Sequence, residues 1–111
     1  MKIKNKDFNG LIQTLNKVGG GDMPYKTARK FRRLLGEIEK QVELYNTNIR
    51  ELDDIKDEDK KKEEFITFFE EEVELNFEGF TESDLDGLQC SVADITFLEL
   101  VMVENDTVIV S

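Results

Sequence analysis

The stretch of residues 24–55 constrains the fold most, because its apolar residues recur at alternating steps of three and four. That spacing places them along one face of a helix and leaves charged residues on the other faces. A straight helix of this length spans about 48 Å. The rest of the chain, or a second copy of it, must therefore cover this face, which we call the heptad seam. Its members are Ala28, Phe31, Leu35, Ile38, Val42, Tyr45, Ile49 and Leu52.

Length and composition indicate one intracellular domain spanning residues 1–111. The single cysteine, Cys90, excludes an internal disulfide framework and fits a reducing compartment. The opening residues are charged and lack a long apolar run, so no signal peptide is expected. No stretch approaches the apolar length of a membrane helix, and no membrane contact is predicted.

Charge is distributed unevenly along the chain, whose net charge is -10. All 15 basic residues lie at or before Lys62, whereas 14 of the 25 acidic residues follow it. The two halves should attract each other, and the acidic surplus faces either water, as a solubility surface, or a cationic partner. The partner-binding residues that this pattern suggests are Glu70, Glu71, Glu74, Glu78, Glu82, Asp84 and Asp86.

The N-terminal part predicts an edge strand over residues 1–4 and a helix over 6–17. Asn5 is the expected N-cap, and the glycine triplet 19–21 should end the helix in the left-handed conformation. A basic cluster then opens the long helix, and it should pair with the acidic half of the chain. Nucleic acid is a weaker alternative, because the total charge repels phosphate. The cluster consists of Lys26, Arg29, Lys30, Arg32 and Arg33.

The polar segment 53–64 predicts a chain reversal, followed by a helix over residues 59–72. The expected result is an antiparallel helical hairpin over residues 24–72, with Phe65, Phe69 and also Phe68 facing the heptad seam. Alternation over residues 73–77 predicts a half-exposed strand. A strand rises about 3.3 Å per residue and a helix 1.5 Å. The strand should therefore carry acidic residues back to the basic cluster: Glu78, Glu82 and Asp84 are expected beside Arg29, Lys30 and Arg33.

The acidic C-terminal part, residues 73–111, also carries two helix starts. Thr81 caps a short turn over residues 82–88, and Ser91 with Asp94 forms a capping-box pair before a helix over 92–103. Residues 107–110 form either a closing strand or a docking strand for another chain. The expected class is α+β and mostly helical: the long hairpin, two shorter helices and a small β element.

The residue types required by most catalytic and metal sites are absent. Without histidine there is no His-based triad or zinc dyad, and a lone cysteine cannot build a zinc site. Asp57 and Asp59 suggest a calcium loop, but Lys62 and Phe68 occupy the positions that need glycine and glutamate. The glycine triplet lacks the rest of a phosphate-binding loop. We predict no catalytic residue, metal or cofactor.

Several stretches in one order resemble a family of small uncharacterised proteins from phages and prophages of Gram-positive bacteria. They are MKIKNKDFNGLIQTL at the start, IEKQVELYN at 38–46, KDED at 56–59, EEEVELNF at 70–77 and SVADITFLEL at 91–100. The glycine triplet, the short reversal after Asp59 and the TVIVS end depart from the family pattern. The family has no agreed activity, so no site residue is carried over. The resemblance implies a phage-encoded accessory protein in the host bacterial cytoplasm.

Two functional hypotheses follow. The first is an accessory interaction protein without catalytic activity, acting in virion (tail) assembly through a virion component or a host protein. It binds no nucleic acid directly, and a homodimer is one way to cover the heptad seam. The second is an acidic inhibitor of a host nucleic-acid enzyme or defence system, a DNA mimic of the anti-restriction or anti-CRISPR kind. Its carboxylates would imitate the spacing of phosphates.

Overall fold

The computed structural model describes residues 1–103 of the chain. Its mostly helical α+β architecture confirms the predicted class. The strand predicted over residues 107–110 lies outside the described residues. The elements, in chain order, are β1 (Lys2–Lys4), α1 (Asn5–Gly19), α2 (Tyr25–Asp53), α3 (Glu58–Glu70), β2 (Glu72–Glu74), α4 (Glu82–Leu85) and α5 (Val92–Glu99).

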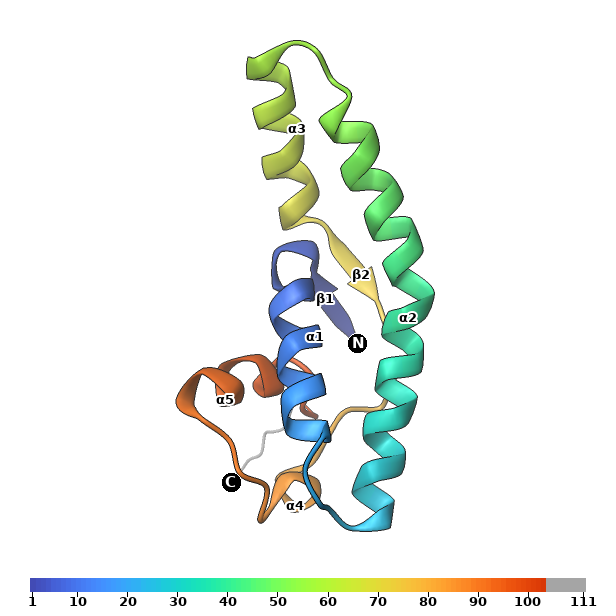
Figure 1. Cartoon of the computed structure of the whole chain (residues 1–111), viewed down its shortest axis with the longest axis vertical. Coiled ribbons are helices and arrows are strands. Elements are labelled where there is room, and N and C mark those ends of the chain that lie inside the picture. Colours follow the sequence, from blue (N-terminus) through green and yellow to red (C-terminus); the bar gives the residue numbers. More distant parts are fainter. Residues whose placement is uncertain (104–111) are drawn as a thin grey trace.

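The long helix α2 dominates the shape of the molecule, which measures 49 × 33 × 25 Å. Pro24 directly precedes it, a position where a residue without a donor N–H costs nothing. Helix α3 folds back antiparallel to the distal half of α2 and forms the predicted hairpin (Figure 1). The hairpin tip projects at one end, while α1, α4 and α5 gather beside the other half of α2 (Figure 1).

The hydrophobic core lies beside the first half of α2. It joins α1, the segment after β2 and the C-terminal part of the described chain, and the two-stranded sheet closes one side. Burial of this much apolar surface is the main force that holds the helices together. Its members are Ile3, Phe8, Leu11, Leu15, Val18, Phe31, Leu34, Ile38, Leu75, Phe77, Phe80, Leu98 and Val101.

The prediction that the heptad seam is the buried face of α2 is only partly correct. Helix α2 buries Thr27, Phe31, Leu34 and Ile38, whereas Leu35 is only partly buried. A straight helix has 3.6 residues per turn, so its buried face drifts relative to a strict heptad. The distal residues of the seam are half-buried, and of these Tyr45 packs against both Phe8 of α1 and Phe68 of α3.

One phenylalanine of α3 is buried between the two helices of the hairpin. It is Phe68, whereas the spacing favoured Phe65 and Phe69. Phe68 is buried and lies 5.5 Å from Tyr45, measured between ring centroids. Phe65 and Phe69 are half-buried and stack on each other at 6.0 Å. Phe68 is the buried phenylalanine because α3 also packs against α1. Phe8 of α1 stacks on Tyr45, with 5.1 Å between the ring centroids.

The sequence predicted Asn5 as the N-cap of α1, and this prediction is wrong. Lys4 is the N-cap, and Asn5 is the first helical residue. Its side chain is needed elsewhere. The Asn5 amide Nδ2 donates to the Phe68 carbonyl at 2.9 Å, and the Asn5 backbone N–H donates to the Glu71 carbonyl at 2.9 Å. The Phe68 carbonyl also accepts the N–H of Glu71, the C-cap of α3, so the Asn5 side chain adds a second donor to it. Asn5 therefore ties α1 to α3.

The glycine triplet ends α1 without the predicted left-handed residue. Gly20 has a φ of -79°, and the N–H groups of Gly20 and Gly21 both donate to the Val18 carbonyl. Short-range hydrogen bonds thus close the last turn of α1, and they satisfy the Val18 carbonyl without a left-handed residue. Within residues 1–103 the positive-φ glycines are Gly79, at 99°, and Gly87, at 81°.

The predicted edge strand over residues 1–4 is confirmed. Strand β1 pairs with β2 in antiparallel register, with Ile3 opposite Val73. Strand β2 starts one residue earlier than predicted, at Glu72, and ends at Glu74 instead of residue 77. Helix α3 accordingly ends at Glu70, two residues before its predicted end. Beyond β2 the alternation continues, because Leu75 and Phe77 are buried while the residues between them are exposed.

Both C-terminal helices begin where predicted and end early. Thr81 and Ser91 form capping boxes with Asp84 and Asp94, respectively. Helix α5 ends at Glu99 because the chain then pairs with Phe80. The Phe80 N–H donates to the Val101 carbonyl, and the Val103 N–H donates to the Phe80 carbonyl. Helix α4 is a single turn that ends before Gly87.

Candidate interaction surfaces

Ion pairs between the two halves of the chain confirm the predicted attraction. Of the eight ion pairs among residues 1–103, six join the basic half to the acidic half, with N···O distances from 2.5 to 3.2 Å. Most are exposed, and such pairs contribute little stability individually. They are Met1 (amino terminus)–Glu74, Lys4–Glu70, Lys6–Glu70, Lys17–Asp94, Lys30–Asp84 and Arg33–Glu78.

Asp84 has the most complete set of partners among these acids. Lys30 Nζ donates to its carboxylate and to the Gly79 carbonyl, and Thr27 Oγ1 donates to the Asp84 carbonyl. The hydrogen bond from Lys30, followed by that from the Thr81 N–H, lowers the pKa of Asp84. Both Lys30 and Asp84 are largely buried. The predicted return of acidic residues to the basic cluster is thus confirmed for Asp84 with Lys30 and for Glu78 with Arg33.

The seven acids suggested as partner-binding residues fall into two groups. Glu70, Glu74, Glu78 and Asp84 form ion pairs within the chain. Glu71, Glu82 and Asp86 are exposed and have no ion-pair partner within residues 1–103. This second group remains open to a partner.

The basic cluster divides in the same way. Lys30 and Arg33 are paired, whereas Lys26, Arg29 and Arg32 are without an acidic partner in the described part of the chain. Beside them Tyr25 is 77 % exposed, and the Arg29 guanidinium lies 5.8 Å from its ring centroid. We call Tyr25, Lys26 and Arg29 the aromatic–basic knob. It occupies the first turns of α2, and the first turn contains no acidic residue.

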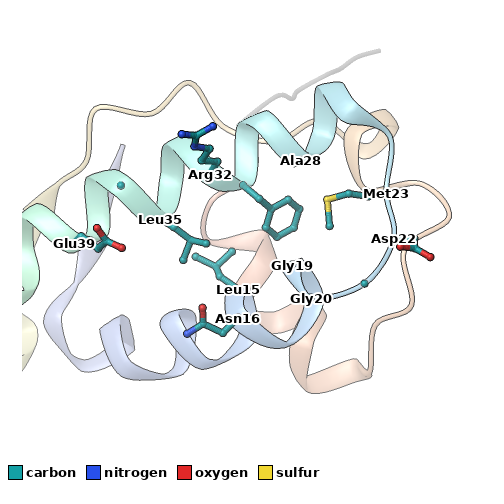
Figure 2. Close-up of a pocket in the computed structure, with 13 residues that line it drawn as sticks. Leu15, Asn16, Gly19, Gly20, Asp22, Met23, Ala28, Arg32, Leu35 and Glu39 are labelled. Atoms are coloured by element: carbon teal, nitrogen blue, oxygen red, sulfur yellow. The ribbon is translucent and has the colours of Figure 1, made fainter.

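A groove of about 720 Å³ lies between the end of α1, the glycine triplet and the first half of α2. Figure 2 shows Leu15 and Leu35 meeting side chain to side chain, with Met23 on the connector. Its charged lining residues are mixed in sign, because Arg32 lies among Asp22 and Glu39. The groove offers apolar contact but no cationic cradle for phosphate.

A second hollow of about 310 Å³ lies between α4, the loop after it and α5. Its apolar lining comes from two separate segments: Leu85, Leu88, Cys90, Ile95, Leu98 and Met102. Three exposed acids that have no ion-pair partner among the described residues, Glu82, Asp86 and Glu99, line it too. We call this the acid-rimmed pocket. The charge pattern of the sequence indicated Glu82 and Asp86 but not the pocket, because only the tertiary fold brings the segments of the pocket together.

Cys90 in this pocket behaves as an apolar lining residue. Burial raises the pKa of its thiol, with a further contribution from the Asp94 carboxylate. A thiol with a raised pKa stays protonated near neutral pH, and the protonated form is the unreactive one. The pocket therefore offers an apolar surface rather than a nucleophile.

The structure places no cluster suited to metal binding in the described chain. Within residues 1–103 there is no group of three or more His, Cys, Asp or Glu side chains that could hold a metal ion. Asp57, which the sequence placed in a calcium-loop pattern, caps α3 by accepting the N–H groups of Asp59 and Lys60. No helix within these residues has both the length and the apolar content to cross a membrane.

Comparisons with protein-family models, with curated proteins and with solved structures find no match. The function must therefore be inferred from the surface of this chain.

Proposed function

We propose that the chain is a phage- or prophage-encoded accessory protein that acts in virion assembly, above all of the tail, by binding other proteins and without catalysing a reaction. The observation that carries this proposal is the acid-rimmed pocket beside an unusually apolar helix. Val92, Ile95 and Leu100 are large apolar side chains of α5 and its C-cap, and all are exposed. Of these, Ile95 lines the pocket. Exposed apolar groups that are rimmed by polar residues are typical of protein-binding surfaces.

The state of the carboxyl groups supports a binding role over a catalytic one. Hydrogen bonds from Lys, Ser or Thr groups, or from the amino terminus, lower the pKa of Glu37, Glu70, Glu74, Asp84 and Asp94. A general acid needs the opposite shift, which burial in an apolar setting produces. These carboxylates therefore serve as ion-pair and capping groups.

The acidic-inhibitor hypothesis has less support. It rests on the net charge and on the exposed Glu71, Glu82 and Asp86. Four of the seven acids that would imitate phosphates are already paired with cations of the same chain, which reduces the negative field they present. A phosphate mimic also has no use for an apolar pocket.

The direct test is capture of partners from phage-infected host lysate with tagged protein, at low and at high salt, followed by mass spectrometry. The Ile95→Glu variant places a charge at the mouth of the pocket, where Ile95 is 48 % exposed. Leu44→Glu is the matched control, because Leu44 is 57 % exposed on the middle of α2.

The proposal expects virion proteins to be retained at high salt by the wild type and by Leu44→Glu, and to be lost by Ile95→Glu. Apolar contacts are insensitive to screening, whereas contacts between exposed charges weaken with salt. Capture of a host nuclease, polymerase or defence protein that is lost at high salt would favour the acidic inhibitor instead.

A further inference from the structure

We infer that the acid-rimmed pocket binds the aromatic–basic knob of a second copy of this chain. The inference goes beyond the proposed function and does not depend on it; both use the same pocket, so a second copy and a virion partner would compete for it. It rests on two surfaces of one molecule that are complementary in charge, one of which is an apolar hollow and the other an exposed aromatic side chain.

The pocket requires an apolar group that is accompanied by cations. Its walls are formed by leucine, isoleucine, methionine and cysteine side chains, which favour an apolar occupant. Its volume of about 310 Å³ is roughly that of ten water molecules in the liquid, enough for one aromatic ring. The carboxylates of Glu82, Asp86 and Glu99 surround it, and they favour positive charge beside the occupant.

The knob supplies that combination. Tyr25 exposes 77 % of its surface and is the first residue of the 29-residue helix α2. Because its backbone belongs to a helix, less backbone ordering entropy is lost on binding than for an extended segment. Lys26 and Arg29 stand next to it without an ion partner in residues 1–103. Tyrosine and arginine are the residue types most common at binding hot spots.

The charge of the whole chain does not prevent the contact. Two copies, each with a net charge of -10, repel each other at long range. At physiological ionic strength the screening length is about 8 Å, so that repulsion is reduced while contacts at 3 to 4 Å keep most of their attraction. High salt should weaken the contact by screening the carboxylate–cation pairs.

Another occupant from the same chain is disfavoured by charge. Residues 104–111 contain Glu104 and Asp106 and no basic residue, so their charge has the same sign as that of the rim. The glycine-triplet groove has no such selectivity, because its charged lining residues are of both signs.

Knob and pocket are different surfaces, so the contact is heterologous. Each copy offers one of each, and repetition of such a contact produces rings or open chains. Self-association of this kind can therefore continue beyond a dimer, and the measured mass gives the number of copies in the assembly.

The test is the mass of the full chain, measured by sedimentation equilibrium from about 1 μM to about 1 mM, the range of weak contacts. The knob variant combines Tyr25→Ser with Arg29→Glu, and the pocket variant combines Glu82→Lys with Asp86→Lys. All four positions are exposed, so the fold should survive, which circular dichroism checks. The control, Glu43→Lys with Glu51→Lys, makes the same charge change as the pocket variant at exposed positions of α2.

The wild type and the control should associate, more weakly in 1 M salt, and each interface variant alone should lose at least tenfold in affinity. An equimolar mixture of the two variants should form a complex again, because one partner keeps its pocket and the other its knob. A wild type that stays monomeric throughout, or association that neither variant weakens, would overturn the inference. Capture of virion proteins by such a monomer would leave the proposed function intact.

Discussion

Two adjacent leucines of α2 provide the sharpest test of the core. Leu34 is fully buried at 0 % exposure, whereas Leu35 is half-buried and lines the glycine-triplet groove. The heptad pattern assigned Leu35 to the core, and the structure assigns Leu34. The pair Leu34→Ala and Leu35→Ala therefore separates the two assignments within one helix.

The expected costs follow from what each side chain loses. Removing a fully buried leucine loses its transfer free energy and leaves a cavity, at about 3 kcal/mol. Removing a leucine that borders an open groove loses part of the transfer free energy and leaves no closed cavity, at about 1 kcal/mol. Helix propensity changes equally in both variants, because both are leucine-to-alanine changes in the helix interior. The difference of about 2 kcal/mol thus reports packing alone.

Urea unfolding at neutral pH measures both changes in the free energy of unfolding, and thermal unfolding, also monitored by circular dichroism, gives the shifts in Tm. At about 4 °C of Tm per kcal/mol for a chain of this length, Leu34→Ala should lower Tm by about 12 °C and Leu35→Ala by about 4 °C. Equal costs, or a larger cost for Leu35→Ala, would refute the assignment of the buried face of α2.

Three further changes test the contacts between elements. Gly10→Ala should destabilise the fold by about 1 kcal/mol despite a helix-propensity gain of similar size, because the new Cβ would lie 2.2 Å from Phe97 Cζ; a stabilised variant in urea unfolding would contradict this. Asn5→Ala should cost about 1 kcal/mol by removing the buried bond to the Phe68 carbonyl, and an unchanged urea midpoint would argue against that role. The pKa of Asp84 is lowered on folding, so its stabilising effect is present above its ordinary value of 3.8 and is lost as pH falls through the folded value. The stability difference between wild type and Asp84→Asn should therefore shrink from pH 7 to pH 3, and a constant difference would show that the Lys30 pair does not stabilise the fold.

The sequence predicted those parts of the fold that depend on local pattern and on charge. The long helix, the hairpin, the Thr81 and Ser91 N-caps and the edge strand at β1 were recoverable from spacing and from residue type. The difference in rise between strand and helix was enough to place Asp84 beside Lys30. These features are determined within one segment or by a few strong charges.

The errors arose where several elements compete for the same face or group. Leu34 replaces Leu35 in the core because α1 and the segment after β2 determine which side of α2 is covered. Asn5 does not cap α1; its side chain donates instead to the Phe68 carbonyl of α3, 63 residues away in sequence. The acid-rimmed pocket was missed for the same reason, since no single segment contains it.

The central claim, a binding role in virion assembly, is tested most directly in the infected host. The gene is deleted from the phage that the proposal expects to encode it. Particle yield and phage DNA copy number are then measured together, with complementation by wild type, by Ile95→Glu and by Leu44→Glu. The account predicts normal DNA copy number and few complete particles on deletion, with rescue by the wild type and by Leu44→Glu but not by Ile95→Glu. Normal assembly together with a fall in DNA copy number would contradict it and would indicate an inhibitor of a host enzyme or defence system.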